Sequence, residues 1–384
     1  MKNKNSSEKS FYDVIVIGAG IAGTYLAGLL AKNKLNVLVI EKSKKIKTDS
    51  GIVSTDIKKI VKLKKSFIKY EIKKMKFVSP SKYEFYLKSE KPYAYILKRE
   101  EFGYWLRYAA RKSGAKFIYN TCERVEINLD FVGVWTISQN GTRQYFVGKL
   151  LIGADGVNSI VRNHIDFNKQ PKVFSGLICK TLTSISKEIT VYLNKYYSPH
   201  FFAWYIPCNN EVGMICKNML MNHFIYFQKS LDFDPTEHYF APIIVSITKS
   251  YSNRCLLVGD ACGQTKPISC GGIIYSLKCS KIANKMIQEA FKENRFDESF
   301  LSRYERRWKK EIGFEIFIQS IARKIYRKMS NKQVDEFFRD FAGYIENIKD
   351  FDYDRLSSII LKLPKFKLLK FLLKNLSILA WSYD

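Results

Sequence analysis

The sequence lacks several patterns by which common classes of site are recognised. Its eight cysteines include no C-x-x-C pair, which argues against an iron–sulfur cluster or a structural zinc site. Its four histidines show no metal-ligand spacing, so we expect no metal; they are His164, His200, His223 and His238. No secretory signal peptide is evident, so we expect reduced cysteines and a cytoplasmic protein.

Long apolar runs and nucleic-acid motifs are also missing. No uncharged apolar run reaches the roughly 20 residues of a spanning helix, so the chain is not expected to cross a membrane. No zinc-finger or RNP-type motif is present, so no nucleic-acid partner is expected.

Acidic residues are scarce. Lys and Arg number 64 against 36 Asp and Glu, a net charge of +28. Such an excess favours an anionic partner, such as an acidic lipid headgroup or a phosphorylated substrate. A lysine-rich coding composition accounts for it equally well, and the sequence leaves both interpretations open.

The order of expected elements indicates an α/β (α+β) fold. Residues 12–17 and 37–40 are short apolar runs typical of buried parallel strands, and 21–33 between them is helical in pattern. Alternating segments predict strands within 70–98, 116–152 (with a hairpin at Asn140-Gly141) and 170–250. Helices are expected at 100–113, 219–230 and 271–291, and throughout the chain beyond 297.

This order predicts a Rossmann-like nucleotide-binding domain interrupted by a second, sheet-based domain. We expect residues 1–165 and 251–296 to form the nucleotide-binding domain. Residues 166–250 would form a β-sheet substrate domain, and residues 297–384 a helical C-terminal region.

The first chemical motif is a G-x-G-x-x-G sequence formed by Gly18, Gly20 and Gly23, directly after a strand and before a helix. These glycines permit a tight turn, approach of a pyrophosphate and close helix–strand packing. Glu41 ends the next strand 23 positions after Gly18 (41 − 18), close to the ~20 expected for a ribose-binding acid. Alone, Glu41 could also be a solvated helix cap.

Two later stretches repeat one pattern, an apolar strand that ends beside an aspartate. They contain Gly153-Ala154-Asp155-Gly156 and Gly259-Asp260-Ala261. A carboxylate at the carboxyl edge of a strand can accept hydrogen bonds from cofactor hydroxyls. Each stretch alone is a common strand-to-turn pattern.

In order and spacing, the three motifs resemble the FAD flavoproteins related to p-hydroxybenzoate hydroxylase. The resemblance implies that the nucleotide-binding domain is a Rossmann-like FAD-binding domain. The resemblance implies that Glu41 binds the adenosine ribose and that Asp155 and Gly156 lie near the pyrophosphate. It also places Asp260 near the ribityl chain or pyrophosphate. Arg99 matches an R-x-x-F position that approaches the cofactor, although a surface arginine is the alternative.

Residues 259–273 further resemble the geranylgeranyl reductase family, whose members carry G-D-A-A-G-Q-x-K-P before a glycine cluster. Backbone N–H groups of Gly271, Gly272 and Ile273 would then face the flavin pyrimidine edge at a helix N-terminus, stabilising the anionic reduced flavin. Cys270 departs from the glycine expected there.

Residues 199–207 are similar to a second reductase pattern, P-x-x-Y-x-W-x-F-P. Phe202, Trp204 and Pro207 would contribute an aromatic wall to a channel for a long apolar chain. Aromatic core residues of a half-buried strand are the alternative. Phe202 replaces the tyrosine of the pattern, which removes one hydroxyl proton donor. Cys270 and His200 remain candidate catalytic residues.

The C-terminal segment has a basic amphipathic pattern. Leucines at 369, 372, 373, 376 and 379 share one helical face, lysines at 367, 370 and 374 another, and Trp381 and Tyr383 follow. Either peripheral contact with the inner face of the cell membrane or docking on the protein's own core would use this pattern.

Together the residues and the resemblance predict an FAD-dependent reductase. It would hydrogenate C=C bonds of geranylgeranyl or other isoprenoid chains in archaeal-type membrane lipids or their prenyl precursors. The electron donor would be external: a ferredoxin, a deazaflavin coenzyme or NAD(P)H. An FAD-dependent monooxygenase on an apolar substrate is the alternative enzyme, and a non-catalytic flavoprotein that binds membranes or nucleic acid is the alternative class.

Overall fold

A mixed eight-stranded sheet forms one half of the molecule, which we describe from a computed structural model covering residues 11–47, 49–165 and 171–376. Its main path runs β17-β18-β11-β1-β2-β8, and β9 and β10 extend it from β11. β1 pairs in parallel with both β2 and β11, and β11 pairs in parallel with β18. The bounds of these strands are β1 Phe11–Ile17, β2 Val37–Ile40, β8 Lys116–Ile118, β9 Asn120–Ile127, β10 Val132–Ser138, β11 Arg143–Gly153, β17 Tyr251–Ser252 and β18 Cys255–Leu257.

Both faces of this sheet are covered, which explains why its strands are continuously apolar. Along β1, Val14 and Val16 pack with the helices, whereas Ile15 and Ile17 pack with residues of β9 and β10. The helices on the first face are α1 Ile21–Lys32, α3 Arg99–Lys112, α6 Ile273–Glu293 and α7 Glu298–Trp308.

A second, seven-stranded sheet has the order β16-β12-β15-β14-β13-β5-β6. Its strands are β5 Lys74–Val78, β6 Glu84–Lys88, β12 Val173–Thr181, β13 Thr190–Tyr192, β14 Ala203–Ile206, β15 Glu211–Cys216 and β16 Pro235–Ile244. β5 pairs in parallel with β13. Residues 74–88 therefore lie in the same sheet as residues 173–244. The expected domain boundaries had placed residues 74–88 in the first part of the FAD-binding domain.

A three-stranded sheet has the order β3-β7-β4, with β3 at Ile52–Ser54, β7 at Ala94–Leu97 and β4 at Ile68–Ile72. The shorter helices are α2 Ile57–Ile60, α4 Ile160–Ile165 and α5 Leu220–Leu231, and 3-10 turns occupy Lys65–Phe67, Pro207–Asn209 and Gly259–Cys262.

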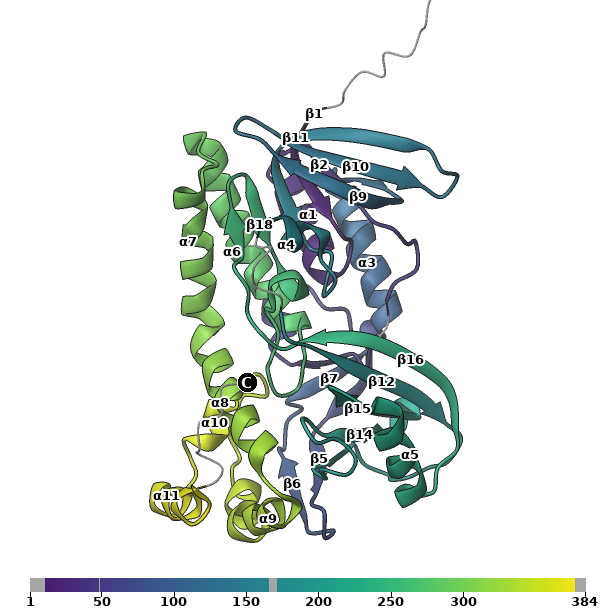
Figure 1. Cartoon of the computed structure of the whole chain (residues 1–384), viewed down its shortest axis with the longest axis vertical. Helices are drawn as coiled ribbons and strands as arrows, with labels where there is room; N and C mark the ends of the chain where they lie inside the picture. Colours follow the sequence, from purple (N-terminus) through teal and green to yellow (C-terminus); the bar gives the residue numbers. More distant parts are fainter. Residues whose placement is uncertain (1–10, 48, 166–170, 377–384) are drawn as a thin grey trace, which may run out of the picture.

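The C-terminal part runs from the first half of the molecule to the second. A π-helical turn, Lys309–Gly313, joins α7 to α8 Phe314–Lys328, and α9 Asn331–Glu346, α10 Ser357–Ile360 and α11 Lys365–Lys374 follow. Figure 1 shows these last helices beside the second sheet, on the side of β5 and β6. The expectation of continuous helix beyond 297 is wrong at residues 347–356, where a non-helical segment contributes the buried side chain of Asp354.

None of the helices in the described ranges has the length and apolar character needed to cross a membrane.

Candidate cofactor and substrate site

The glycine-rich loop connects β1 to α1 at the carboxyl edge of the parallel sheet. Gly18 has φ +97°, and a Cβ at this position would lie 2.3 Å from the carbonyl oxygen of Ala154. A Cβ at Gly23 would lie 2.0 Å from the carbonyl oxygen of Gly18. Gly20, the N-cap of α1, has no atom within 4 Å of the corresponding point. Side chains at positions 18 and 23 would therefore break the loop, while Gly20 leaves room for a ligand.

Glu41 fixes this loop while lining the same cavity. Its carboxylate accepts hydrogen bonds from the backbone N–H groups of Ala19 (2.7 Å) and Ser43 (3.0 Å). Buried Arg107 lies 3.9 Å from it. Because a carboxylate has about four acceptor positions, Glu41 can still accept bonds from ligand hydroxyls.

Asp155 and Asp260 lie at the ends of neighbouring strands β11 and β18 and line the cavity with Gly156. One oxygen of Asp155 accepts a hydrogen bond from Ile160 N–H (2.8 Å), whereas Oδ1 is buried without a partner in the described residues. Burial raises the pKa of Asp155. Enclosure by protein also raises the pKa of Asp260, against the opposing effect of Lys47, although its side chain is accessible from the cavity.

Arg99 begins α3 and also faces the cavity. Its Nε donates to both carboxylate oxygens of Asp49 at 3.0 Å. Its Nη1 is buried and has no partner among the described residues. Asp49 thus holds Nε of the guanidinium in place, and Nη1 remains available to donate to a ligand.

The helix α6 begins beside Asp260. Gly272 is its N-cap and Ile273 its first residue, and with Gly271 they line the cavity. A Cβ at Gly272 would lie 3.0 Å from Asp260 Oδ1. Cys270, where the family pattern has glycine, adopts φ +56°, a left-handed conformation that ordinarily favours glycine.

The cavity has a volume of about 1540 Å³ and continues from the glycine-rich loop to the C-terminal helices. It exceeds the roughly 300–1,000 Å³ typical of small-molecule sites. Away from the loop its walls are largely apolar, with side chains from the second sheet and from α8, α9 and α11; they include Met75, Phe77, Phe85, Val191, Met329, Phe338 and Phe371.

Two of the three expected substrate-wall residues line this cavity. Phe202 and Trp204 form an edge-on pair with ring centroids 6.0 Å apart. Trp204 Nε1 donates to buried Glu211 at 3.1 Å, a polar contact that the sequence pattern did not indicate. Pro207 is not among the lining residues and instead begins a 3-10 turn.

The two candidate catalytic residues line the cavity but are not tuned for proton transfer near neutral pH. Burial raises the pKa of Cys270 to about 12, so its thiol keeps its proton. Burial, with the nearby charges of Lys195 and Arg327, lowers the pKa of His200 to about 4, so its ring is neutral. An efficient general acid or base has a pKa near the working pH, which neither residue has.

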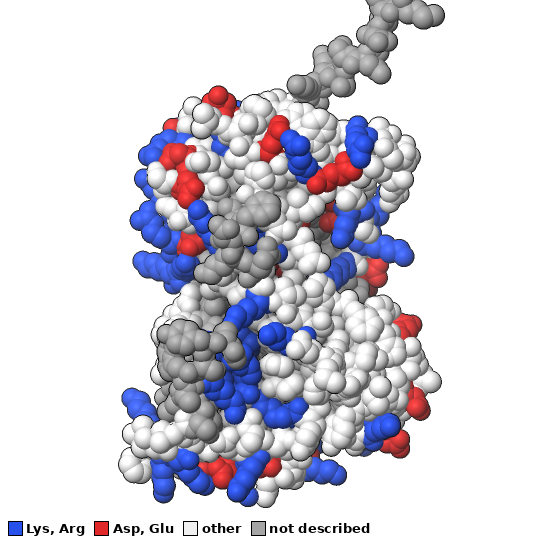
Figure 2. Space-filling model, in the orientation of Figure 1, with Lys and Arg blue, Asp and Glu red and all other residues white. Residues whose placement is uncertain are grey.

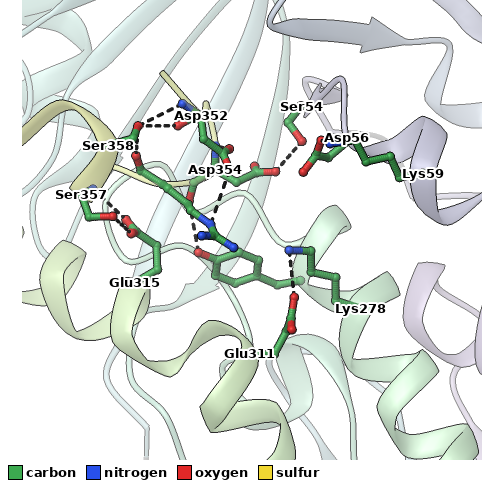
Figure 3. Close-up of polar contacts among 12 residues, drawn as sticks. Ser54, Asp56, Lys59, Lys278, Glu311, Glu315, Asp352, Asp354, Ser357 and Ser358 are labelled. Carbon is green, nitrogen blue, oxygen red and sulfur yellow. Dashed lines mark hydrogen bonds and ion pairs between the residues drawn. The ribbon is translucent and has the colours of Figure 1, made fainter. Parts of the chain in front are cut away.

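A buried ion pair beside the glycine cluster was not expected from the sequence. Lys266 lines the cavity, and its Nζ lies 2.9 Å from Asp354 Oδ1, with both side chains about 6% exposed. Burial opposes the charge of Lys266, but Asp354 outweighs it and raises the pKa. Asp354 comes from the non-helical segment 347–356 and also accepts from Ser54, as Figure 3 shows.

Comparison with known proteins agrees with this geometry. The family model described as an FAD binding domain matches residues 11–242, more than half of the chain. The chain belongs to this FAD binding domain family. Its cofactor is therefore FAD.

Several curated relatives of the chain share one name. The digeranylgeranylglycerophospholipid reductase of Methanocaldococcus jannaschii is 28% identical over 363 residues, which cover 88% of this chain and 92% of the relative. The enzyme of the same name from Methanosarcina acetivorans is 28% identical, with 97% of each chain covered.

Solved structures show the same FAD-binding fold. A geranylgeranyl bacteriochlorophyll reductase-like protein from Thermoplasma acidophilum superposes with a TM-score of 0.80, at 21% identity over 96% of this chain and 99% of that one. The halogenase PltM in complex with phloroglucinol and FAD gives a TM-score of 0.63, at 17% identity over 93% and 87%.

The residues around the cavity suit the FAD of this family. Asp155 Oδ1 and Arg99 Nη1 are buried polar atoms that need partners, and both residues line the cavity. FAD carries hydroxyl donors for the first and carbonyl or phosphate acceptors for the second. The space above Gly20, at the start of α1, suits a phosphate.

Proposed function

We propose that the protein is an FAD-dependent reductase that hydrogenates C=C bonds of geranylgeranyl or other isoprenoid chains, in archaeal-type membrane lipids or their prenyl precursors. One structural observation carries the proposal: a single cavity joins the FAD-binding loop to an apolar space walled by aromatic side chains. The names of the archaeal relatives support the substrate class.

Each cofactor-site residue then has a role. Gly18, Gly20 and Gly23 position the N-terminus of α1 against the pyrophosphate, and Glu41 binds the adenosine ribose. Asp155 with Gly156, and Asp260, bind the pyrophosphate and ribityl regions. Arg99 approaches the cofactor, and Gly271, Gly272 and Ile273 present backbone N–H groups to the flavin pyrimidine edge.

Held by these residues, reduced FAD would provide the hydride that one alkene carbon needs. An isolated C=C bond offers no polar group to hold, so the chain's contribution is positioning and exclusion of water. Phe202 and Trp204 line the apolar space that would hold the prenyl chain. Cys270 and His200 stay the candidate proton donors from the motifs, although their pKa values disfavour this role at neutral pH.

Electrons would come from an external donor: a ferredoxin, a deazaflavin coenzyme or NAD(P)H. A peripheral membrane contact would bring the lipid to the cavity. Helix α11 supports that contact because Phe366, Leu369 and Leu373 are exposed on it, while Phe371 of the same helix is buried. Leu379, Trp381 and Tyr383 lie outside the described residues.

The test is a single-turnover reduction. Purified protein is reduced anaerobically with dithionite and mixed with a geranylgeranyl lipid, and the product is weighed by mass spectrometry. We expect a gain of one H₂ for each reduced double bond. Asp260→Ala protein should lose flavin and give no gain, whereas Glu90→Ala, an exposed acid that does not line the cavity, should behave as wild type.

A flavin that is reduced while the lipid mass stays unchanged would refute prenyl reduction with that lipid. A separate experiment tests the monooxygenase alternative: oxygen is admitted to the reduced protein, and hydroxylated products are sought. The similarity to halogenases does not decide between them, because at 17% identity it shows the fold alone.

A further inference from the structure

A carboxyl group is buried directly behind the wall of the cavity. Figure 2 shows Asp and Glu side chains at the molecular surface, where water stabilises the ionised carboxylate. Glu211 of β15 differs from these, because it is only 3% exposed. It also differs from buried Asp354, which is paired with the charge of Lys266, since the donors that hold Glu211 are neutral. A carboxyl in this setting needs a reason beyond surface solvation.

Two residues of the cavity wall hold this carboxyl. The Ser50 hydroxyl donates to Oε1 of Glu211, and the Trp204 indole Nε1 donates to the same oxygen at 3.1 Å. Ser50 and Trp204 line the cavity, whereas Glu211 is not among its lining residues. Glu211 therefore communicates with the cavity through these two side chains.

Ser50 lies where the cofactor end of the cavity meets its apolar part. Its neighbour Asp49 accepts from Arg99, and the charges of both act on Asp260 at the end of β18. On the other side, Trp204 belongs to the aromatic wall. A double bond held at this junction would lie between the flavin site and the apolar space.

The surroundings of Glu211 favour its protonated form. Burial is the largest effect and raises the pKa of Glu211, and the charge of Asp49 raises it further. The hydrogen bonds that it accepts and the charge of Lys180, its partner across β12, act in the opposite direction. Cys179 and Cys208 are also within electrostatic reach, and burial raises the pKa of both thiols. A carboxyl with a raised pKa is the kind that enzymes use as a general acid near neutral pH.

We propose that Glu211 supplies, through the hydroxyl of Ser50, the proton that completes the reduction of a double bond in the cavity. A serine hydroxyl both donates and accepts. Protonated Glu211 can therefore donate to Ser50 Oγ while Ser50 donates into the cavity. Ser50 is the group that would touch the substrate, and Glu211 is a positioning residue that acts through it. This role rests on the proposed function.

The step balances in atoms and electrons. One alkene carbon takes the hydride of the proposed reaction, so the alkene is reduced. The π electron pair moves to the other carbon and forms a C–H bond with the proton of Ser50. The Ser50 O–H bond breaks as its oxygen takes the proton of Glu211. The Glu211 carboxylate recovers a proton from water when the product leaves.

Glu211→Gln separates proton supply from packing, because the glutamine carbonyl can still accept from Ser50 and Trp204. The assay is single-turnover reduction of a geranylgeranyl lipid by dithionite-reduced protein. We expect this variant to reduce the alkene about a hundredfold more slowly, with the rate of flavin reduction and the lipid affinity unchanged. Glu211→Asp should restore part of the rate. Glu90→Gln, at an exposed acid that does not line the cavity, is the matched control and should behave as wild type.

The pH profile distinguishes a proton source from a structural contact. The protonated carboxyl is the active form, so the wild-type rate should fall as the pH rises through the raised pKa of Glu211. Glu211→Gln should lack this fall. Ser50→Ala should be as slow as Glu211→Gln, and the double variant should be no slower, because residues that act as a unit are not additive.

Infrared difference spectroscopy gives a readout that needs no turnover. At neutral pH, the difference between wild type and Glu211→Gln should contain the carbonyl band of a protonated carboxylic acid, and this band should shift in D₂O. A difference that contains only the bands of an ionised carboxylate would overturn the proposal. Alkene reduction by Glu211→Gln at the wild-type rate would overturn it as well.

The two proposals fail in different measurements. Wild type that reduces its flavin without adding mass to the lipid rejects the reductase, and the relay from Glu211 falls with it. Wild-type reduction of the lipid together with an equally fast Glu211→Gln rejects only the relay. Ser50→Ala removes a single hydroxyl, so its rate decides the question if Glu211→Gln does not fold: a wild-type rate for Ser50→Ala overturns the proposal.

Discussion

His200 has its acid–base behaviour set by its surroundings. Burial and then the positive charges of Lys195, Arg327 and Lys217 lower its pKa to about 4, against 6.5 for an ordinary histidine. The folded protein therefore resists protonation of this ring in a pH range where the unfolded chain accepts a proton.

A pH series should expose this resistance. Between pH 6.5 and 4 the unfolded chain binds more protons at His200 than the folded one, so this residue lowers stability as the pH falls through that window. As the pH falls through this window, the free energy of unfolding of wild type should therefore decrease relative to that of His200→Gln, by at most about 1.4 kcal/mol per pH unit. Chemical denaturation at several pH values measures this difference. Parallel pH profiles for the two proteins would contradict it.

Local motifs predicted many of the cavity-lining residues, but not the arginine that α8 contributes. Gly18, Glu41 and Asp260 follow from sequence because a strand end and its turn fix where such residues point. Arg323 of α8 also lines the cavity, but as one of 64 Lys and Arg residues it is not marked by any motif. Its guanidinium lies beside the rings of Phe174 and Phe201, which belong to a distant part of the sequence, and only the folded structure brings the three side chains together.

At the level of elements, the segment 347–356 ties the C-terminal helices to the cofactor end of the cavity. Asp354 reaches Lys266 and Ser54, and the Tyr353 ring lies 4.5 Å from Lys266 Nζ. Gln319 of α8 donates to the backbone carbonyl of Asp354 at 3.2 Å, and Figure 3 shows Ser357, at the start of α10, directed at Glu315 of α8. One short non-helical segment thus connects α8, β3 and the turn before α6.

Breaking the Lys266–Asp354 ion pair should lower the stability of the fold. Asp354→Asn leaves Lys266 as a buried charge without its carboxylate, so we expect a loss of about 3–5 kcal/mol in the free energy of unfolding. Asp350→Asn, an exposed acid of the same segment, should lose little. The double variant Lys266→Met/Asp354→Leu should recover part of the loss. Urea denaturation makes the comparison, and equal losses for Asp350→Asn and Asp354→Asn would refute this account.

Sequence alternation located strands but not their partners. The pattern within 70–98 predicts strands; β5, β6 and β7 lie there, and β4 overlaps its start. Alternation reports which side chains share a face, not which strand lies alongside. The parallel pairing of β5 with β13, which joins Lys76 to Thr190, therefore became evident only in the structure.

At the scale of the whole molecule, the cavity draws its walls from both large sheets and from the C-terminal helices. FAD would contact β1, β11 and β18 at their carboxyl edge, together with α1 and α6. A ligand that touches so many elements should stabilise all of them together.

FAD should therefore raise the stability of the entire chain. At a free concentration of about a hundred times its dissociation constant, the expected gain is about 2.7 kcal/mol. Gly18→Val should show no gain, because its Cβ would clash with Ala154. Gly343→Ala, where no atom lies within 4 Å of a Cβ, is the control and should respond as wild type. Thermal unfolding with and without FAD gives the result, and a response by Gly18→Val would contradict it.

The strand order has a consequence for synthesis on the ribosome. β1 pairs with β11, and β11 in turn with β18, so the central sheet cannot be completed until residues far along the chain have been synthesised. Asp260 and the start of α6 emerge only after the whole of the second sheet has been made. A nascent chain therefore holds an incomplete flavin site through about two thirds of its translation, and the complete site can form only after Asp260 and the start of α6 have left the ribosome.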